Sequence, residues 1–167
     1  MNIQPALKSQ YHAALNTLRE AIDKCPAAMW NDPADGFTAV WRVAYHTLFF
    51  AHFYLSADEK SFTPWERARH EAQYLGPLFW ENNRLPKSCE PYTPADIMEY
   101  WNFCDRLIDS AVDALNLDSP QSGFPWYKMS KLEHQILNIR HIQNHAAALA
   151  TRLRRGAGAN VGWVAKG

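Results

Sequence analysis

Apolar residues recur at intervals of three and four along four long stretches of the chain, and no stretch alternates with the two-residue period of a β-strand. Such spacing places apolar side chains on one face of an α-helix, where they can pack against a core. The stretches cover residues 5–24, residues 38–56, a segment that begins at Thr93 and ends near residue 115, and residues 130–155. Four helices of this length without an internal repeat predict an all-α four-helix bundle.

Capping residues predict where the helices begin and end. Thr93 supplies a hydroxyl N-cap with Asp96 three residues later, which is close to a capping box. Ser130 and Glu133 complete a full S-x-x-E box, so the start of the last helix is the clearest boundary in the chain. We expect this helix to run to about residue 155, with Gly156 as its C-cap.

Residues 26–36 contain two prolines and a glycine and predict a turn-rich connection. We expect Met29 and Trp30 of this segment to pack against the core. The next helix should then begin near Thr38, whose hydroxyl is a plausible N-cap.

Two further segments have less regular patterns. Residues 57–92 mix aromatic residues, charges and prolines, and they predict a long connection between helices two and three that covers one end of the bundle, with a short helix over residues 65–74. The glycine-rich tail carries three large apolar residues, and we expect it to fold back onto the bundle. These residues are Val161, Trp163 and Val164.

The length and charge of the chain narrow the function classes. A chain of 167 residues with 47% hydrophobic content can form one domain, residues 1–167, with a substantial core. Seventeen Lys and Arg residues balance seventeen Asp and Glu residues, so no net charge draws the chain towards nucleic acid or anionic lipid. The one basic cluster, residues 152–155, is explained by a helix C-terminus. A small or neutral partner is therefore the better expectation.

The cysteines and the N-terminus favour a cytoplasmic location. The chain has three cysteines, an odd number, and Cys25 and Cys104 lie in or beside apolar helical stretches where a reduced thiol packs as a small hydrophobe. The first ten residues lack the charged and apolar regions of a secretory signal. Residues 37–55 are the most apolar stretch, but they include Arg42, His46 and His52, which favours a buried helix over a membrane span.

Two histidines of the last helix have the spacing of metal ligands. His141 and His145 are four residues apart, so their side chains leave one helix face about 6 Å apart and can reach a single ion. His134 is on the same stripe, but about 10 Å from His141 along the axis. We therefore expect His134 to be partly exposed or to support the site indirectly.

A third ligand has to come from another helix. His12, His46, His52 and His70 are the candidates, and His46 is the best placed because it lies in the middle of a strongly apolar helix. His52, six residues further on, points to another side of that helix. Metal binding is one reading of this pattern. The other is that a chance HxxxH pair and a hydrogen-bonded core histidine produce the same spacing, because the glutamate of a zincin motif is missing.

The histidine segments AVWRVAYHTLFFAHFYL and NIRHIQNHAAALATRLRR, together with a VGWV tail, resemble the DinB-like superfamily of four-helix-bundle proteins. The resemblance extends over the whole chain and is most distinctive in the two histidine segments. It implies an up-down-down-up bundle, frequent homodimers and a three-histidine metal site. Carried over by position, the ligands of that site are His46, His141 and His145.

Three neutral imidazoles leave coordination positions open for water or substrate, which is typical of a catalytic metal site. Histidine nitrogens suit zinc, nickel, iron or copper. The resemblance implies thiol-dependent transferases or isomerases, so our first hypothesis is an enzyme that joins a low-molecular-weight thiol to an electrophilic small molecule, with the metal as Lewis acid. The second is a non-catalytic dimeric bundle that binds metal or a small apolar ligand. No residue is identified as a general base. Glu133 and His134 lie too near the helix start to be assigned that role. Tyr45, Arg42 and Trp126 are candidates for lining a pocket, although a core aromatic or a solvated charge is the expected role of each.

Overall fold

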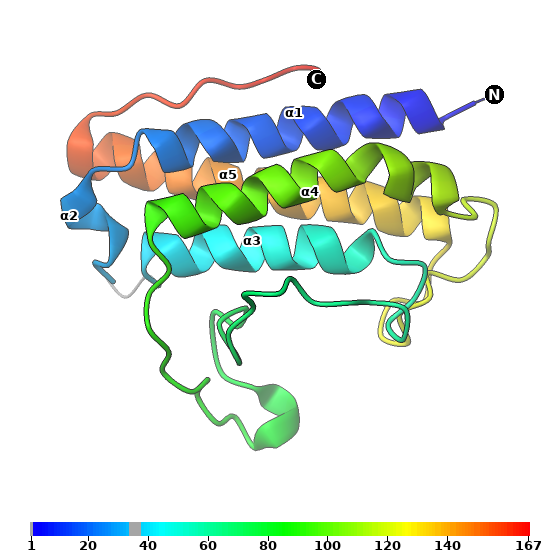
Figure 1. Cartoon of the computed structure of the whole chain (residues 1–167), viewed down its shortest axis with the longest axis horizontal. Helices are drawn as coiled ribbons and strands as arrows, with labels where there is room; N and C mark the ends of the chain where they lie inside the picture. Colours follow the sequence, from blue (N-terminus) through cyan, green and yellow to red (C-terminus); the bar gives the residue numbers. More distant parts are fainter. Residues whose placement is uncertain (1, 34–37) are drawn as a thin grey trace.

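The computed structural model describes residues 2–33 and 38–167. Within these ranges the protein contains α-helices, one 3-10 helix and no strand beyond an isolated bridge between Leu78 and Arg84, which confirms the all-α class (Figure 1). The helices are α1 (Gln4–Asp23), α2 (Ala27–Trp30), α3 (Val40–Tyr54), η2 (Phe79–Glu81), α4 (Pro94–Ala114) and α5 (Lys131–Ala157).

The four long helices lie side by side, and each packs against two others. Both α1 and α3 contact α4 and α5. The α3 and α5 helices are antiparallel, because the Asn138 amide donates to the Ala51 carbonyl at 3.1 Å while the Gln135 amide donates to the Tyr54 carbonyl at 3.0 Å. Figure 1 shows that α3 and α4 run in the same direction, and that α1 and α5 run in the opposite one.

The core is formed by the apolar faces that the helical spacing predicts. On α1 the predicted positions are buried, and every α-helix contributes at least one side chain to a continuous cluster. Full burial of one large apolar side chain, such as that of leucine or isoleucine, stabilises the fold by roughly 1.5–3 kcal/mol. Trp30 is buried, and its indole donates to the Tyr92 carbonyl at 2.8 Å, while Met29 packs against the same cluster. The expected core contacts of residues 29 and 30 are confirmed. Part of the predicted turn, residues 34–36, lies outside the described residues.

The capping box of α4 is confirmed, and at the start of α5 the structure shows the Ser130 half of the predicted box without a return bond to the Glu133 side chain among the described residues. The Thr93 hydroxyl accepts from the Asp96 amide at 3.2 Å, and the Asp96 carboxylate accepts from the Thr93 amide at 2.9 Å, so the capping box is complete. The Ser130 hydroxyl accepts from the Glu133 amide at 3.2 Å at the start of α5. These bonds satisfy backbone donors that a helix start would otherwise leave unpaired.

Two predicted caps differ from the structure, by two residues at the end of α5 and by one residue at the start of α3. The α5 helix passes Gly156 and ends at Ala157, because Gly158, with a φ of 66°, supplies the left-handed C-cap. The α3 helix begins at Val40, one residue later than a helix capped by Thr38 would begin. The Thr38 hydroxyl donates to the Leu75 carbonyl at 3.2 Å and so ties a distant segment to the helix start.

Residues 57–92, hereafter the connecting segment, form turns over residues 65–74, so the helix predicted there is wrong. Glu71 adopts a φ of 61°, which a continuous right-handed helix does not allow. Its buried carboxylate accepts from both Arg84 guanidinium nitrogens, at 2.7 and 3.0 Å. The segment also runs along the side of α3 instead of covering one end of the bundle, because Arg42 donates to the Glu71 and Tyr74 carbonyls at 3.4 and 3.3 Å.

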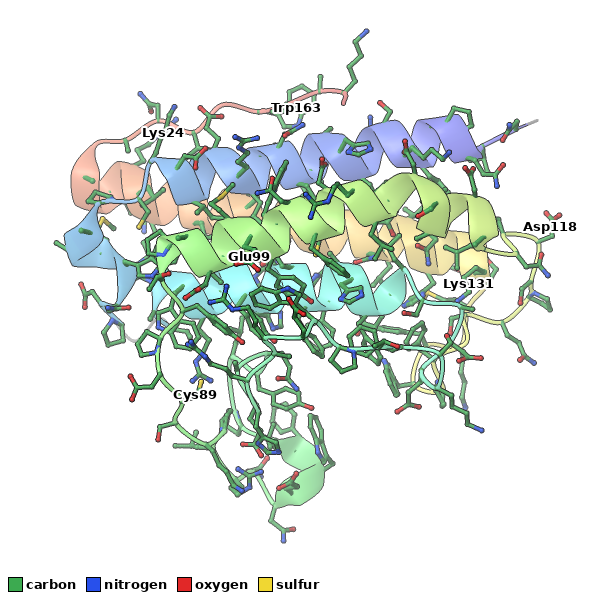
Figure 2. The ribbon with its side chains drawn as sticks, viewed as in Figure 1. Lys24, Cys89, Glu99, Asp118, Lys131 and Trp163 are labelled. Atoms are coloured by element: carbon green, nitrogen blue, oxygen red, sulfur yellow. The ribbon has the colours of Figure 1, made fainter. Side chains whose placement is uncertain are left out.

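The C-terminal tail runs back along α1, as predicted (Figure 1). The Gly162 amide donates to the Glu20 carboxylate at 2.9 Å, and the Gly167 amide donates to the Ser9 carbonyl at 3.1 Å. Val161 packs against the core, whereas Trp163 lies on the outside with 77% of its surface exposed (Figure 2). Backbone and polar contacts therefore hold the tail more than its tryptophan does.

Two findings bear on the environment of the chain. The three cysteines are free thiols, and Cys104 is buried. Across the described residues, every helix is too short or too polar to traverse a lipid bilayer.

Candidate metal centre

Three histidines meet at the seam between α3 and α5. His46 Nε2 lies 3.1 Å from His141 Nε2 and 3.1 Å from His145 Nε2. One ligand nitrogen from each ring lies within 4.8 Å of the other two, and all three residues are partly exposed. The structure thus brings together the three residues that the spacing and the resemblance indicated.

Local helix geometry explains this convergence. His141 and His145 are one turn apart on α5, so their rings leave the same face, and their centroids are 4.6 Å apart. The amides of Gln135 and Asn138 hydrogen-bond to α3 carbonyls, which fixes the register between the two helices. In that register the middle of α3 faces the α5 pair, and His46 occupies this position.

A backbone carbonyl fixes the tautomer of His46. Its Nδ1 lies 2.6 Å from the carbonyl oxygen of Gln73, in the connecting segment. Because a carbonyl can only accept, Nδ1 carries the proton and donates, and Nε2 presents its lone pair to the other two rings. This is the arrangement by which protein carbonyls orient histidines that bind metals.

All three rings are neutral at pH 7. The pKa of His46 is lowered to about 4, mainly by burial; the hydrogen bond to Gln73 opposes this shift, and the neighbouring His145 adds a smaller lowering. Burial, followed by the charges of His46 and His145, lowers the pKa of His141 to about 3. Burial also lowers the pKa of His145. Neutral imidazoles are the form that binds a metal ion.

Hydrogen bonding among the rings does not account for the cluster. The single in-plane lone pair of His46 Nε2 can accept one N–H well, yet two ring nitrogens approach it at 3.1 Å. Two nitrogens held by one ion at about 2.0–2.1 Å are about 2.9–3.4 Å apart, for angles between a right angle and the tetrahedral value. The donor set therefore fits a divalent transition metal.

Phe50 borders the cluster on α3. Its ring meets the His46 ring edge-on at a centroid distance of 4.8 Å and the His141 ring at 5.8 Å. This aromatic side chain lowers the local polarity on one side of the rings, while the partial exposure of all three histidines leaves another side open to solvent. The cluster therefore lies where the bundle meets solvent and is not sealed in the core.

The other histidines lie elsewhere. His134 is wholly buried beside Tyr54 and Phe124, at centroid distances of 4.7 and 4.9 Å, so the first of its two expected places, a partly exposed one, is wrong. As for the second, indirect support of the site, neither of its nitrogens has a hydrogen-bond partner among the described residues. Its place in the first turns of α5 is covered by Phe124 and Tyr127, which lie in the loop before that helix. His52 points to Tyr100 of α4, His12 pairs with Asp105, and the side chain of His70 is 76% exposed.

The residues considered for pocket roles have other contacts. Tyr45 is fully buried and stacks on Tyr92 at 4.6 Å. Trp126 is 51% exposed and stacks on Phe53 at 6.2 Å. Arg42 holds the connecting segment, and Glu133 is an exposed residue of the first α5 turn.

The roles of two contributors to the centre were not predicted. The Gln73 carbonyl is a backbone group in an irregular segment, so no side-chain pattern identifies it. Phe50 is one of several aromatic residues on α3. Its position four residues after His46, one helical turn away, indicates that the two rings are neighbours.

Comparison of the chain with known protein families, with curated proteins and with solved structures finds no match. The chemistry of the centre therefore rests on its own residues: three neutral imidazoles, one fixed tautomer and an accessible side.

Proposed function

We propose that the protein binds one divalent transition metal ion, zinc, nickel or iron, on His46, His141 and His145. The observation that carries the proposal is the convergence of three neutral Nε2 atoms, with a separation of 3.1 Å for each of the two pairs that include His46. We further propose that the chain is a member of the DinB-like superfamily, with an up-down-down-up four-helix bundle. The opposite directions of the α1–α5 and α3–α4 pairs support this membership (Figure 1).

The proposed activity is conjugation of a low-molecular-weight thiol to an electrophilic small molecule. A metal ion in such a site acts as a Lewis acid that lowers the pKa of a bound water or thiol. The residues of the chain orient and shield the site: the Gln73 carbonyl holds the His46 ring, and Phe50 excludes water from one side. Three protein ligands leave room for the reactant, as in other catalytic sites.

A cytoplasmic homodimer is part of this proposal. Free thiols in all three cysteines suit a reducing compartment. Around η2, Phe79 is 79% exposed, Trp80 66% and Leu85 70%. Exposed apolar groups that gather in one segment are typical of an interaction surface, and they favour the alternative function as well, a non-catalytic dimeric bundle that binds metal or a small ligand.

Metal analysis of the purified protein tests the site. We expect about one zinc, nickel or iron ion per chain, and loss of that ion in His141→Ala and in His46→Ala. The matched control is His70→Ala, because His70 is a surface histidine outside the cluster. Retention of stoichiometric metal by both cluster variants would exclude the site.

Activity then separates the two functions. Conjugation of cysteine to chlorodinitrobenzene is followed by absorbance, with the metal-loaded protein, the chelated protein and His141→Ala. The enzyme proposal predicts thiol-dependent turnover only in the loaded protein, with folding retained after chelation. If chelation unfolds the protein and no thiol is consumed in any sample, the metal is structural and the alternative function holds.

A further inference from the structure

A groove of about 590 Å³ lies between the C-terminal end of α3, the outer side of α4 and the first part of the connecting segment. Its apolar wall is formed by Leu55, Trp65, Phe103 and Leu107. The volume is within the range of pockets that bind small molecules. Among the described residues that line it, none belongs to the histidine cluster, so the groove is a separate site.

His52 lies at the floor of this groove and is 6% exposed. Phe62 and Phe103 hold its ring edge-on, each at a centroid distance of 4.9 Å. Nδ1 lies 3.1 Å from the Tyr100 hydroxyl, on the core side. Within residues 2–33 and 38–167 no protein group bonds to Nε2, and this atom is not among the fully enclosed polar atoms without a partner, so it keeps accessible surface at the groove that His52 lines.

The hydrogen bond between Tyr100 and His52 determines which nitrogen of His52 carries the proton. Tyr100 is fully buried, so its hydroxyl proton needs an acceptor, and His52 Nδ1 is the partner that the structure provides. Burial raises the pKa of Tyr100 and lowers the pKa of His52 to about 4, so both groups are neutral at pH 7. Tyr100 thus donates to Nδ1, and Nε2 bears a hydrogen. The floor of the groove presents one N–H donor.

The groove carries charges of both signs. Glu66, Glu99 and Arg106 line it. Glu99 is paired with Arg67, which also pairs with Asp96, and Figure 2 shows Glu99 on α4. Glu66 and Arg106 are the acidic and the basic lining groups outside this ion-pair network. A ligand with a net charge of either sign would meet attraction and repulsion together, so the surroundings favour an uncharged molecule.

We propose that this groove binds a small, uncharged molecule with a flat apolar body and a carbonyl-type acceptor, which accepts a hydrogen bond from His52 Nε2–H. The aromatic and aliphatic wall takes the apolar body. The N–H selects for the acceptor, because a bound ligand without one would cut this donor off from water and leave it unpaired. The proposal is independent of metal binding at the histidine cluster.

Nuclear magnetic resonance of the ¹⁵N-labelled full-length protein tests both parts of the proposal. Long-range ¹H–¹⁵N spectra identify the His52 tautomer, and we expect the hydrogen on Nε2. Acetophenone is the neutral acceptor probe. It should shift the His52 Nε2 and Trp65 indole signals in a saturable manner, whereas benzylamine and benzoate should bind at least several-fold more weakly.

Two variants make the test specific. His52→Phe keeps the ring and removes the donor, and it should weaken acetophenone binding by about 3–10-fold. Ala111→Leu narrows the groove from α4 and leaves Tyr100 bonded to His52, so it keeps the test valid if the first variant does not fold. His70→Gln on the surface and His141→Ala in the cluster are controls that should bind acetophenone like the native protein.

The proposal is overturned by any one of three results. These are a hydrogen on Nδ1 instead of Nε2, no saturable shift with acetophenone at tens of millimolar, or equal affinity in the native protein and in whichever groove variants fold. Loss of acetophenone binding in His141→Ala would show that the two sites are not separate, while metal retention in that variant would contradict the metal proposal alone.

Discussion

His134 and His141 lie on the same side of α5, two turns apart, and both are neutral and largely removed from water, yet only one of them has the surroundings of a ligand. His141 has two imidazole neighbours and an accessible side. His134 is 0% exposed, its ring lies 5.1 Å from the Tyr127 ring, and neither of its nitrogens has a protein partner among the described residues. The comparison teaches that burial alone does not mark a metal site. A metal site is marked by ring nitrogens whose lone pairs converge on one point and by partial exposure to solvent.

Substitutions of His134 and of His141 should differ most in their effect on metal affinity. Structural zinc sites with four ligands have binding free energies of roughly 10–16 kcal/mol, so each ligand supplies about 2.5–4 kcal/mol. His141→Leu should therefore weaken zinc binding by a few hundredfold in a competition titration with a chromophoric chelator. His134→Leu should leave the affinity within about twofold. If both substitutions weaken zinc binding equally, the distinction between the two histidines is wrong.

The next effect is the pH dependence of stability. Burial, assisted by the charge of Lys131, lowers the pKa of His134 from 6.5 to about 4. As the pH falls, His134 therefore becomes protonated in the unfolded chain at a higher pH than in the folded protein. Its ionisation does not change the free energy of unfolding above pH 6.5, and it lowers that free energy increasingly as the pH falls from 6.5 towards 4. We expect the native protein to lose about 1–2 kcal/mol more than His134→Leu between pH 8 and pH 5.

Urea unfolding at both pH values, with chelator present throughout, measures this difference. The chelator removes the competing effect of metal release from the cluster. A native protein and a His134→Leu variant that lose the same free energy of unfolding on acidification would show that His134 is not held neutral.

At pH 8 His134→Leu should itself be stabilising. The leucine has a volume similar to that of histidine and does not bury two ring nitrogens without partners. We expect a gain of about 1 kcal/mol in the free energy of unfolding. The matched substitution His141→Leu in the chelated protein should give a smaller gain, because His141 Nε2 has a ring nitrogen of His46 at 3.1 Å. A larger gain in the free energy of unfolding for His141→Leu than for His134→Leu would contradict this comparison.

The smallest effect concerns the helix start next to His134. Ser130→Ala removes the side-chain acceptor of the Glu133 amide and should cost about 0.5–1 kcal/mol. Hydrogen exchange should rise in the first turns of α5, around His134, and stay unchanged around His141. Faster exchange along the whole of α5, with weaker zinc binding, would show that the two regions open together.

Much of this fold is local and was predicted from the sequence. The apolar stripe of α1 and the boxes at Thr93 and Ser130 depend on residues within one or two turns of each other. The spacing of His141 and His145 is of the same kind, since a helix alone places them on one face. His46 was chosen among four candidates by its apolar surroundings, which is a weaker inference.

The remaining features depend on contacts between distant residues. The turns of the connecting segment follow from the pairing of Glu71 with Arg84 and from the positive φ of Glu71. The burial of His134 depends on a loop near Phe124 that folds over it. Neither contact leaves a periodic pattern in the sequence, so the predicted helix over residues 65–74 and the predicted exposure of His134 were both wrong.

The acceptor of the His46 ring is a main-chain oxygen, which every amino acid possesses. Exchanging Gln73 for another residue therefore leaves the same atom in place, whereas adding or deleting a single residue between the end of α3 and position 73 would present a different peptide unit to the imidazole. In protein engineering, this part of the chain should tolerate changes of residue type far better than changes of length.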